Sequence, residues 1–474
     1  MQAKYLAGSV WSGLNAAVSI VVPLGVFVFF AREVPPARMG VVAYGMAWVE
    51  IIKVFAPTGL YEALLSAEDY DEAAGAASGL LMVSGLVGCA IFSAIMLCAR
   101  FWMPGAALLA PLLLLLGARV FFDIVVVQPQ ASLARRLDFQ RLAVRTLTAN
   151  ISAAVGGVIL GRFVDPLTGF VAYYVLQSFV LWLMTVAGTR ALARPSAAWG
   201  PLKRIGRNAY LSTQVRALGT FNNFADQIIT AAFITPAAIA LYNLGKKVEI
   251  NQITATNSFT SILFQPLFAR RQDDQLGRDF QRSLLVISLI SGVPTALFVA
   301  NATSLVPTIF GKQWTAAAPI AAALAVSGFA RAIGGVPGAY FSVNGQNDVL
   351  RNRSLVSAIT GMAIVCLTGV VGLLAMAWML AVKNILITGW SAWHTRRLAG
   401  PVFYARDVLG VLIAGGVAAW LGRMGSQAVF SGHGIAGQLL IWTLSGVACV
   451  LGLACLYFHE IRRLAGGWLK LKLA

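Results

Sequence analysis

Long runs of apolar residues, each about 20 residues in length, follow one another along most of the chain and constrain its fold more than any other feature. A helix needs about 20 such residues to cross a bilayer, and within lipid it must satisfy its own backbone polar groups. Cutting the runs at charge clusters and at Pro or Gly turns predicts about fourteen spans. They cover approximately residues 9–31, 40–64, 75–99, 106–131, 142–161, 167–189, 209–234, 237–268, 283–303, 316–344, 354–371, 373–393, 404–422 and 435–457.

The predicted fold is therefore all-α: a polytopic membrane protein of about fourteen transmembrane helices, in two six-helix lobes plus two C-terminal helices. The longest polar connector divides the first twelve spans near their middle, and we interpret it as a cytoplasmic linker. The predicted domains are an N-lobe with helices 1–6 (1–194), the linker (195–208), a C-lobe with helices 7–12 (209–398), and two extra helices with an interfacial cytoplasmic tail (399–474). Glycine pairs four residues apart, such as Gly157 and Gly161, are expected to serve packing within the bundle.

The charge content supports a membrane location and gives an orientation. Only 11% of the residues are charged, against about 25% in soluble proteins, which excludes an ordinary soluble enzyme, a disordered chain or a nucleic-acid-binding domain. With an even number of spans and a cytoplasmic N-terminus, 23 of the 36 Lys and Arg residues lie in cytoplasmic segments and 6 on the opposite side. The positive-inside rule thus predicts that both termini are cytoplasmic. It also explains most of the net charge of +18 without a nucleic-acid partner.

Eleven charged residues lie inside the predicted spans, where each costs roughly 2.5–3.5 kcal/mol on insertion scales. The basic ones are Lys53, Arg119, Arg216, Lys246, Lys247, Arg331 and Lys383, and the acidic ones are Glu50, Asp123, Asp226 and Glu249. So many charges imply a polar cavity, and their excess of basic residues favours an anionic substrate. Guanidinium groups bind phosphate through paired, charge-assisted hydrogen bonds. We therefore predict a cationic, substrate-binding cavity formed by the seven basic residues, with Arg331 and Lys383 nearest the middle of the membrane.

The spacing of some of these charges allows a second interpretation. Glu50 with Lys53 and Lys246 with Glu249 are three residues apart, and Arg119 with Asp123 are four apart, so each pair shares one helix face. The alternative for each pair is an internal ion pair that binds no substrate. The alternative for Arg216 is that its side chain extends to the cytoplasmic interface. The four acids are candidates for ion coupling or for charge balance alone.

Two short sequences occur at corresponding positions of the predicted lobes. Ala-Arg occurs at 118–119 and 330–331, and Val-Glu-Ile occurs at 49–51 and 248–250, each time with a lysine nearby. These matches predict an internal repeat. Paired repeats with a binding site near the membrane midplane are typical of alternating-access transporters.

Several segments carry a recognisable pattern in a fixed order and spacing, through the residues Trp11, Ser12, Ala31, Arg32, Pro36, Gly40, Phe55, Gly59, Leu60, Ala63, Leu64, Arg135, Phe139, Asp226, Pro236, Leu241, Tyr242, Phe310, Gly311, Trp314 and Pro319. Together these segments resemble the polysaccharide-transport flippases of the multidrug/oligosaccharidyl-lipid/polysaccharide exporter superfamily. The chain has Pro57-Thr58 where family members often have Asp before the Gly-Leu pair, and it has Ala240 where a Gly is usual.

The resemblance implies export of a lipid-linked oligosaccharide, or a related polysaccharide intermediate, from the cytoplasmic to the periplasmic leaflet of a bacterial inner membrane. The carrier in such families is usually a polyprenyl pyrophosphate, which agrees with a cationic cavity. The expected partners are the membrane, the lipid-linked substrate, and the polymerase and glycosyltransferases of the same pathway.

No sequence pattern indicates an enzyme, a metal site or a cofactor. The three histidines and five cysteines are scattered, and a GxxxxGK[ST] loop for ATP is lacking. The driving force is then expected to be an ion gradient, the membrane potential or removal of the substrate.

Three alternative functions stay open. A drug/cation antiporter of the same superfamily would need an acidic cavity, a membrane enzyme of polysaccharide assembly would need a sizeable outward loop, and a structural membrane protein would not need eleven intramembrane charges.

Overall fold

A computed structural model of the protein describes residues 2–99, 101, 106–187, 191–269, 273–430 and 434–472. These residues form helices joined by turns, with no strand among them, which confirms the predicted all-α class. The chain divides into two compact units, residues 1–243 and 244–474, which we call unit 1 and unit 2.

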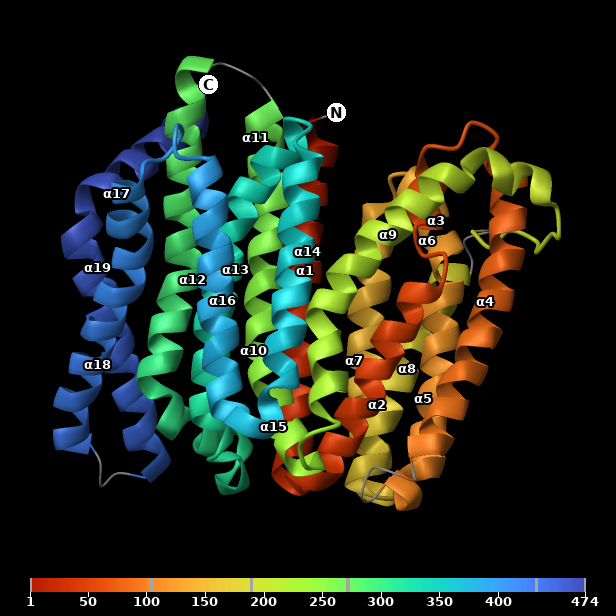
Figure 1. The fold of residues 1–474 in the computed structure, drawn as a ribbon, viewed down its shortest axis with the longest axis horizontal. Coiled ribbons are helices and arrows are strands. Elements are labelled where there is room, and N and C mark those ends of the chain that lie inside the picture. The colour runs from red at the N-terminus through yellow and green to blue at the C-terminus, as the bar shows by residue number, and fades with distance from the viewer. Residues whose placement is uncertain are drawn as a thin grey trace. The chain divides into compact units, whose positions relative to one another are not determined.

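The described residues of unit 1 form nine helices and the first turns of a tenth, and in Figure 1 the long helices α4, α5, α7 and α8 run along one another. These helices are α1 (Gln2–Glu33), α2 (Pro36–Phe55), α3 (Leu60–Leu65), α4 (Tyr70–Ala99), α5 (Ala106–Val125), α6 (Val127–Arg135), α7 (Phe139–Phe163), α8 (Pro166–Val186) and α9 (Trp199–Thr230).

Unit 2 contains the rest of α10 (Pro236–Phe259) and all the elements that follow it (Figure 1). They are η1 (Thr260–Phe264), α11 (Gln265–Ala269), α12 (Asp273–Phe310), η2 (Lys312–Trp314), α13 (Ala317–Val343), α14 (Asn347–Cys366), α15 (Thr368–Val371), α16 (Leu373–His394), α17 (Pro401–Phe403), η3 (Tyr404–Leu409), α18 (Gly410–Phe430) and α19 (Gly434–Lys472).

Proline explains where two predicted spans are interrupted. The span predicted at 40–64 is two helices, because Ala56, which precedes Pro57, is extended (φ −75°, ψ 150°) and ends α2. The residue before a proline is pushed out of the helical region by the proline ring. The span predicted at 237–268 passes through the π-helix η1 just before Pro266, where the missing N–H interrupts regular α-helical hydrogen bonding.

Aspartates begin two neighbouring helices of unit 1. The Asp165 carboxylate accepts hydrogen bonds from the backbone N–H groups of Leu167 (3.0 Å) and Thr168 (3.2 Å), and Pro166 occupies the first position of α8. Asp138 accepts from the N–H of Arg141 (3.2 Å) and caps α7. These caps satisfy backbone donors that would otherwise lack partners at a helix start.

The two capped helices, α7 and α8, approach each other closely at a contact between glycine residues. A Cβ on Gly169 of α8 would overlap backbone atoms of Gly157 and Gly161 on α7, so the two backbones touch where these residues meet. The Gly157/Gly161 spacing therefore serves packing within the bundle, as predicted, and small residues permit such an approach in membrane proteins.

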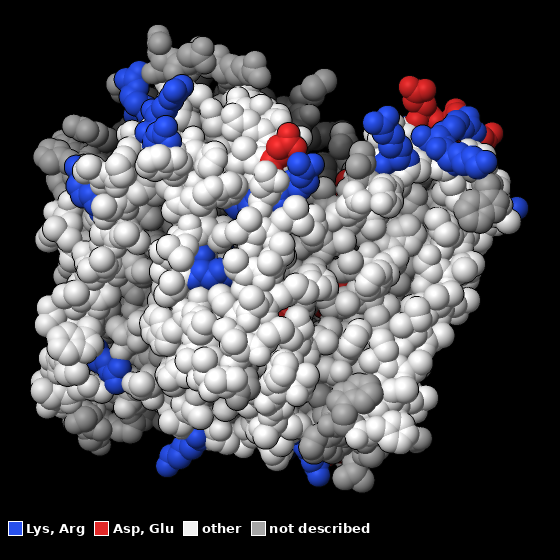
Figure 2. All heavy atoms as spheres, in the orientation of Figure 1, with Lys and Arg blue, Asp and Glu red and all other residues white. Residues whose placement is uncertain are grey.

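Helix length, apolar surface and charge placement agree with a multi-pass membrane protein. Ten helices among the described residues are long and apolar enough to cross a bilayer. Val83, Leu86 and Val87 on α4 are more than half exposed, as expected of side chains that face lipid. Within each unit, Figure 2 shows the charged atoms of this face mainly at the helix ends. The count of about fourteen spans stays a prediction. The helices α2 and α10 are not among these ten candidate spans, and each of them carries three charged residues.

The boundary between the compact units differs from the predicted linker. From Trp199 onward the predicted linker (195–208) forms the first turns of α9, which packs on α2 and α3 within unit 1. The units divide inside α10, after Asn243. The functional lobes at 1–194 and 209–398 stay a prediction, because packing in one conformation does not show which helices move together.

The side chains of the predicted interfacial tail after Tyr457 lie outside the described residues.

Gly40 supports a prediction about stability. A Cβ on Gly40 of α2 would overlap the backbone carbonyl of Pro236, which begins α10 within unit 1. Because backbone atoms cannot rotate away, we expect Gly40→Ala to lower the free energy of unfolding by about 1–3 kcal/mol. Thermal unfolding of the purified protein in detergent measures the change.

The control for this experiment is Gly219→Ala on α9, where a Cβ would meet no atom within 4 Å. Alanine has a higher helix propensity than glycine, so this variant should unfold at the same or a slightly higher temperature than the wild type. Equal melting of the two variants would contradict the close approach at Gly40.

Candidate functional site

Four charged residues of unit 1 form a continuous chain of ion pairs between α2 and α5. Lys53 Nζ lies 2.8 Å from Glu50 Oε1 and 2.9 Å from Asp123 Oδ2. Arg119 Nε lies 3.4 Å from the same Asp123 oxygen. Two basic and two acidic groups take part, so the chain is formally neutral.

Helix geometry and tertiary packing contribute different contacts to this chain. The i,i+3 pair on α2 and the i,i+4 pair on α5 form as their spacing predicts. The packing of α2 on α5 adds the contact between Lys53 and Asp123, which are 70 residues apart in sequence. Arg119 also faces α8, where its Nη1 donates to the Tyr174 carbonyl (3.4 Å) and its Cζ lies 5.0 Å from the centre of the Tyr174 ring. Carboxylates therefore already engage Lys53 and Arg119.

Glu249 is the centre of a second network, in unit 2. Its side chain is 2% exposed, and its Oε2 lies 2.8 Å from Lys246 Nζ on the same helix, α10. Its Oε1 lies 3.2 Å from Arg331 Nη1 and accepts a 2.7 Å hydrogen bond from Ser327 Oγ, both on α13. Asn384 Nδ2 of α16 donates to Ser327 Oγ (2.7 Å) and so ties a third helix to the network. One carboxylate serves two basic groups, which gives these three charges a net value of +1.

The two networks use the residues of the predicted repeat. In unit 1 the glutamate of Val-Glu-Ile (Glu50) and the arginine of Ala-Arg (Arg119) are joined through Lys53 and Asp123. In unit 2 the corresponding glutamate, Glu249, contacts the corresponding arginine, Arg331, directly. The repeated sequences thus take part in an ion-pair network in each unit, which is partly buried in unit 1 and centred on a fully buried carboxylate in unit 2.

Two further basic residues lie where α13, α14 and α16 pack together. Lys383 Nζ on α16 lies 3.3 Å from both the carbonyl oxygen and Oγ of Ser357 on α14. Arg353 Nη1 donates to the Gly334 carbonyl of α13 (2.7 Å), and Arg353 and Arg331 lie within electrostatic range of each other. Arg353 and Ser357 are four residues apart on α14 and share one face. We call Lys246, Arg331, Arg353 and Lys383 the unit 2 cationic cluster. Lys247, partly buried on α10, is adjacent in sequence to this cluster.

Arg353 is not among the site residues predicted from the sequence. The predicted span begins at residue 354, so the orientation argument counts Arg353 with the basic residues of a cytoplasmic connector. In the structure α14 begins at Asn347, so Arg353 lies well inside the helix. A small-residue face accommodates its guanidinium, since a Cβ on Gly338 would lie 3.5 Å from Arg353 Nη2. The glycine pair at 334 and 338 was the signal in the sequence that could have indicated a neighbouring large side chain.

The structure places Arg216 and Asp226 outside both networks. Arg216 on α9 pairs with Glu62 on α3 (Nε to Oε1 2.9 Å), and both side chains are nearly half exposed. Asp226 accepts a 2.6 Å hydrogen bond from the hydroxyl of Tyr242, which is fully buried. Asp226 therefore joins the end of α9 to the start of α10.

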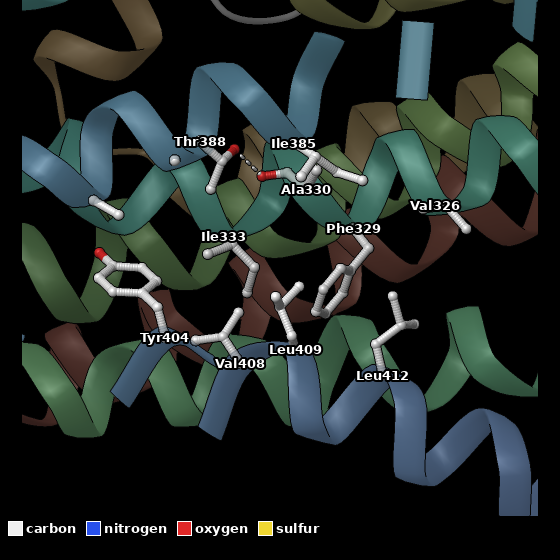
Figure 3. A pocket seen from close by; sticks show the side chains of 12 residues that line it. Val326, Phe329, Ala330, Ile333, Ile385, Thr388, Tyr404, Val408, Leu409 and Leu412 are labelled. Atoms are coloured by element: carbon white, nitrogen blue, oxygen red, sulfur yellow. Dashed lines mark hydrogen bonds between the residues drawn. The ribbon is translucent and has the colours of Figure 1, made fainter. Parts of the chain in front are cut away.

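An apolar cleft of about 130 Å³ lies between α13, α16 and the segment η3–α18. Figure 3 shows Phe329, Ile333 and Leu412 among the side chains that line it. Its lining hydroxyls are already bonded within the protein: Thr388 donates to the Ala330 carbonyl (2.7 Å), and Tyr404 bonds Thr395 (3.2 Å). Arg331 is not among the lining residues, although its neighbour Ala330 is. The cleft therefore offers little to an anion, whereas the cationic cluster offers several charged donors.

Comparison with known protein families assigns the chain to one of them. A family model described as "Polysaccharide biosynthesis protein" matches residues 29–319. The chain belongs to this family. The matched region includes the Phe-Gly-x-x-Trp turn, where Gly311 has φ +105° and Trp314 is fully buried. A positive φ of this size favours glycine.

One relative and two solved structures show similarity of different kinds. The "Teichuronic acid biosynthesis protein TuaB" of Bacillus subtilis (strain 168) is 25% identical over 171 residues, and this match covers 35% of each chain. The structure titled "Lipid II flippase MurJ, inward closed conformation" has a TM-score of 0.73 at 10% identity, covering 96% of this chain and all of that chain. An inward-facing multidrug resistance MATE family transporter of the MOP superfamily has a TM-score of 0.59 at 13% identity, covering 80% of this chain and 95% of that chain.

At these identities the solved structures show a shared fold, and both belong to proteins named as a flippase or a transporter rather than an enzyme. The described residues contain no group of three or more His, Cys, Asp or Glu side chains that could hold a metal ion.

The unit 2 network leads to a prediction about stability. Glu249→Gln removes the carboxylate shared by Lys246 and Arg331, and breaking a buried pair leaves uncompensated charge. We expect the free energy of unfolding to fall by about 3–5 kcal/mol. Adding Lys246→Met should restore part of the loss, and thermal unfolding of purified variants measures both effects.

Asp348→Asn is the matched control. Asp348 pairs with Arg351 at 3.1 Å, but its side chain is 85% exposed. Exposed pairs contribute about 0–1 kcal/mol, so this variant should melt close to the wild type. Equal melting of Glu249→Gln and Asp348→Asn would contradict a structural role for the Glu249 network.

Proposed function

We propose that the protein is a flippase that moves a polyprenyl-(pyro)phosphate-linked oligosaccharide or polysaccharide intermediate from the cytoplasmic to the periplasmic leaflet of the bacterial inner membrane. The observation that carries the proposal is the unit 2 cationic cluster, in which two basic side chains share the Glu249 carboxylate and two more lie nearby. The head group would bind this cluster while the lipid chain remains in the bilayer.

Electrostatics favours phosphate as the bound group. A positive cluster surrounded by apolar helices attracts an anion strongly, because the low dielectric constant weakens screening. Arg331 and Arg353 present planar guanidinium groups, which suit the oxygens of a phosphate or pyrophosphate. The four-residue network of unit 1 is neutral and supplies no comparable excess of charge.

Binding and release would then change the partners of Arg331. A phosphate that reaches Arg331 competes with Glu249 for the guanidinium, and Lys246 remains to neutralise the carboxylate. We infer that alternating access moves the head group between leaflets, with both termini in the cytoplasm. The acids Glu50, Asp123, Asp226 and Glu249 are the candidates for a coupling ion or for charge balance alone.

The family and the fold also support this proposal, independently of the site residues. The family model carries the description "Polysaccharide biosynthesis protein". The Bacillus subtilis relative, which matches over 35% of the chain, is named as a teichuronic acid biosynthesis protein. The lipid II flippase shares the fold over nearly the whole chain. Such a flippase would work beside the glycosyltransferases and the polymerase of its pathway.

The second candidate function is an ion-coupled drug/cation antiporter. The multidrug resistance MATE transporter has a similar fold, and Glu50 and Asp123 provide partly buried carboxylates in unit 1. A cationic drug would require an excess of acid, however, and the unit 2 cluster has an excess of base. A membrane enzyme of polysaccharide assembly is the third and weakest candidate.

Removing the central basic residues tests the site. We expect the double variant Arg331→Gln/Lys383→Gln to abolish export while leaving the amount of protein in the membrane unchanged, because charge-assisted bonds to the phosphate are lost. Arg351→Gln is the control, since Arg351 is 62% exposed and pairs with Asp348. Wild-type export in the double variant would overturn the site.

Depletion of the protein tests the reaction step. Lipid-linked oligosaccharides are extracted from depleted cells, and their leaflet is measured by accessibility in intact spheroplasts. We expect completed units to accumulate facing the cytoplasm. If no unit is made, the enzyme is the better interpretation, and completed units on the outer face would show that translocation does not need this protein.

A further inference from the structure

The face of α10 that lies opposite its ion pairs is polar. Lys247, Asn251, Thr254 and Asn257 follow one another at intervals of three or four residues, so they form one stripe along the helix, which we call the polar stripe. Thr254 and Asn257 are exposed, and Lys247 and Asn251 are partly exposed. Glu249, on the opposite face, is buried and belongs to the unit 2 network.

This stripe differs from the exposed surface of a helix that faces lipid. With 24 residues, α10 is about 36 Å long, which is enough to cross the hydrocarbon core. On α4 the exposed large side chains are apolar, as at Val83, Leu86 and Val87. Among the described side chains of α10, the one large apolar side chain that is exposed is Phe259, at the end of the helix. Polar side chains within a membrane face water or protein rather than lipid, so the stripe indicates contact with water.

The side chains of the polar stripe suit the hydroxyl groups of a sugar. An asparagine amide has two donors and an acceptor, and a threonine hydroxyl both donates and accepts. A sugar hydroxyl group also donates and accepts, so both sides of such a contact can be satisfied. The one charged member of the stripe, Lys247, is basic and would attract an acidic sugar rather than a cationic drug.

The polar stripe adjoins the unit 2 cationic cluster at both of its ends. Lys247 directly follows Lys246, a member of the cluster. At the other end, a Cβ on Gly335 of α13 would lie 3.9 Å from Asn257 Oδ1. Gly335 is four residues after Arg331, so both lie on one face of α13. A ligand whose phosphate binds Arg331 can therefore extend along the stripe, which covers about 15 Å of helix.

We propose that the polar stripe lines a water-filled cavity and binds the hydroxyl groups of an oligosaccharide whose phosphate binds the unit 2 cationic cluster. This site rests on the proposed function and deepens it, because it assigns the sugar part of the substrate to named side chains. Recognition of the sugar and of the phosphate then uses different faces of α10.

Cysteine labelling tests the contact with water and needs no substrate. The five native cysteines of the full-length protein are first replaced by alanine. We expect Thr254→Cys to react with a water-soluble, membrane-impermeant methanethiosulfonate in membranes opened to both sides. Thr256→Cys is the control on the same helix, because Thr256 is 2% exposed, and Val83→Cys is the control for a lipid-facing position, because Val83 is 60% exposed. No labelling of Thr254→Cys, or equal labelling of Val83→Cys, overturns the cavity.

Binding of two lipids to the full-length protein in detergent tests the contact with sugar. The probes are undecaprenyl pyrophosphate and the lipid-linked oligosaccharide extracted from cells depleted of the protein, and native mass spectrometry measures both affinities. We expect Asn251→Ala and Asn257→Ala each to weaken binding of the lipid-linked oligosaccharide about threefold to tenfold, the effect of one lost hydrogen bond. Their affinity for undecaprenyl pyrophosphate should stay at the wild-type value, since alanine favours a helix more than asparagine does. Asn347→Ala is the matched control, because Asn347 is exposed at the start of α14, outside the stripe.

The two probes separate the sugar site from the phosphate site. Arg331→Gln should weaken binding of both lipids, whereas the asparagine variants should weaken only the lipid that carries sugar. Wild-type affinity of both asparagine variants for the lipid-linked oligosaccharide, or an equal loss for the two lipids, overturns the sugar site and leaves the proposed function standing. If the wild-type protein binds neither lipid, the proposed function fails together with the sugar site, and the labelling of Thr254→Cys still measures the cavity.

Discussion

Neutralisation of charge among apolar helices is the constraint on which the rest of the structure depends. An isolated charge in lipid is expensive, so a basic side chain there requires a carboxylate, a ring of dipoles or a ligand. Glu249 is the clearest example: one buried carboxylate draws Lys246 of its own helix and Arg331 of α13 together. The hydrogen bonds of Ser327 and Asn384 extend this connection to α16.

The same short sequences lead to different electrostatics in the two units. Around Glu50 and Arg119, Lys53 and Asp123 complete a neutral chain between α2 and α5. Around Glu249, the carboxylate is shared by the two basic groups of Lys246 and Arg331, and the Ser327 hydroxyl donates a further hydrogen bond to it. Unit 2 therefore keeps an excess of positive charge, which suits an anionic head group, and unit 1 keeps its balanced network for internal cohesion.

The candidate site could be predicted only in part. The contacts of Lys53 with Glu50, and of Lys246 with Glu249, follow from i,i+3 spacing, because three residues on a helix return to nearly the same face. The contact of Arg331 with Glu249 joins residues 82 apart in sequence, and periodicity within a helix carries no information about such a partner. Arg353 was missed for a related reason: its hydrogen bond to Gly334 depends on how α14 packs on α13.

By itself the sequence determined the environment of this protein: apolar runs of membrane-spanning length, an all-α fold, and ion pairs whose partners share a helix. Only the tertiary structure decided which charges are cancelled. Lys53 and Arg119 meet Asp123 because α2 packs on α5, whereas Arg145 on α7 meets a hydroxyl instead of a carboxylate. The physical reason is that electrostatic energy depends on distance in space, and distance between helices is set by side-chain packing rather than by sequence separation.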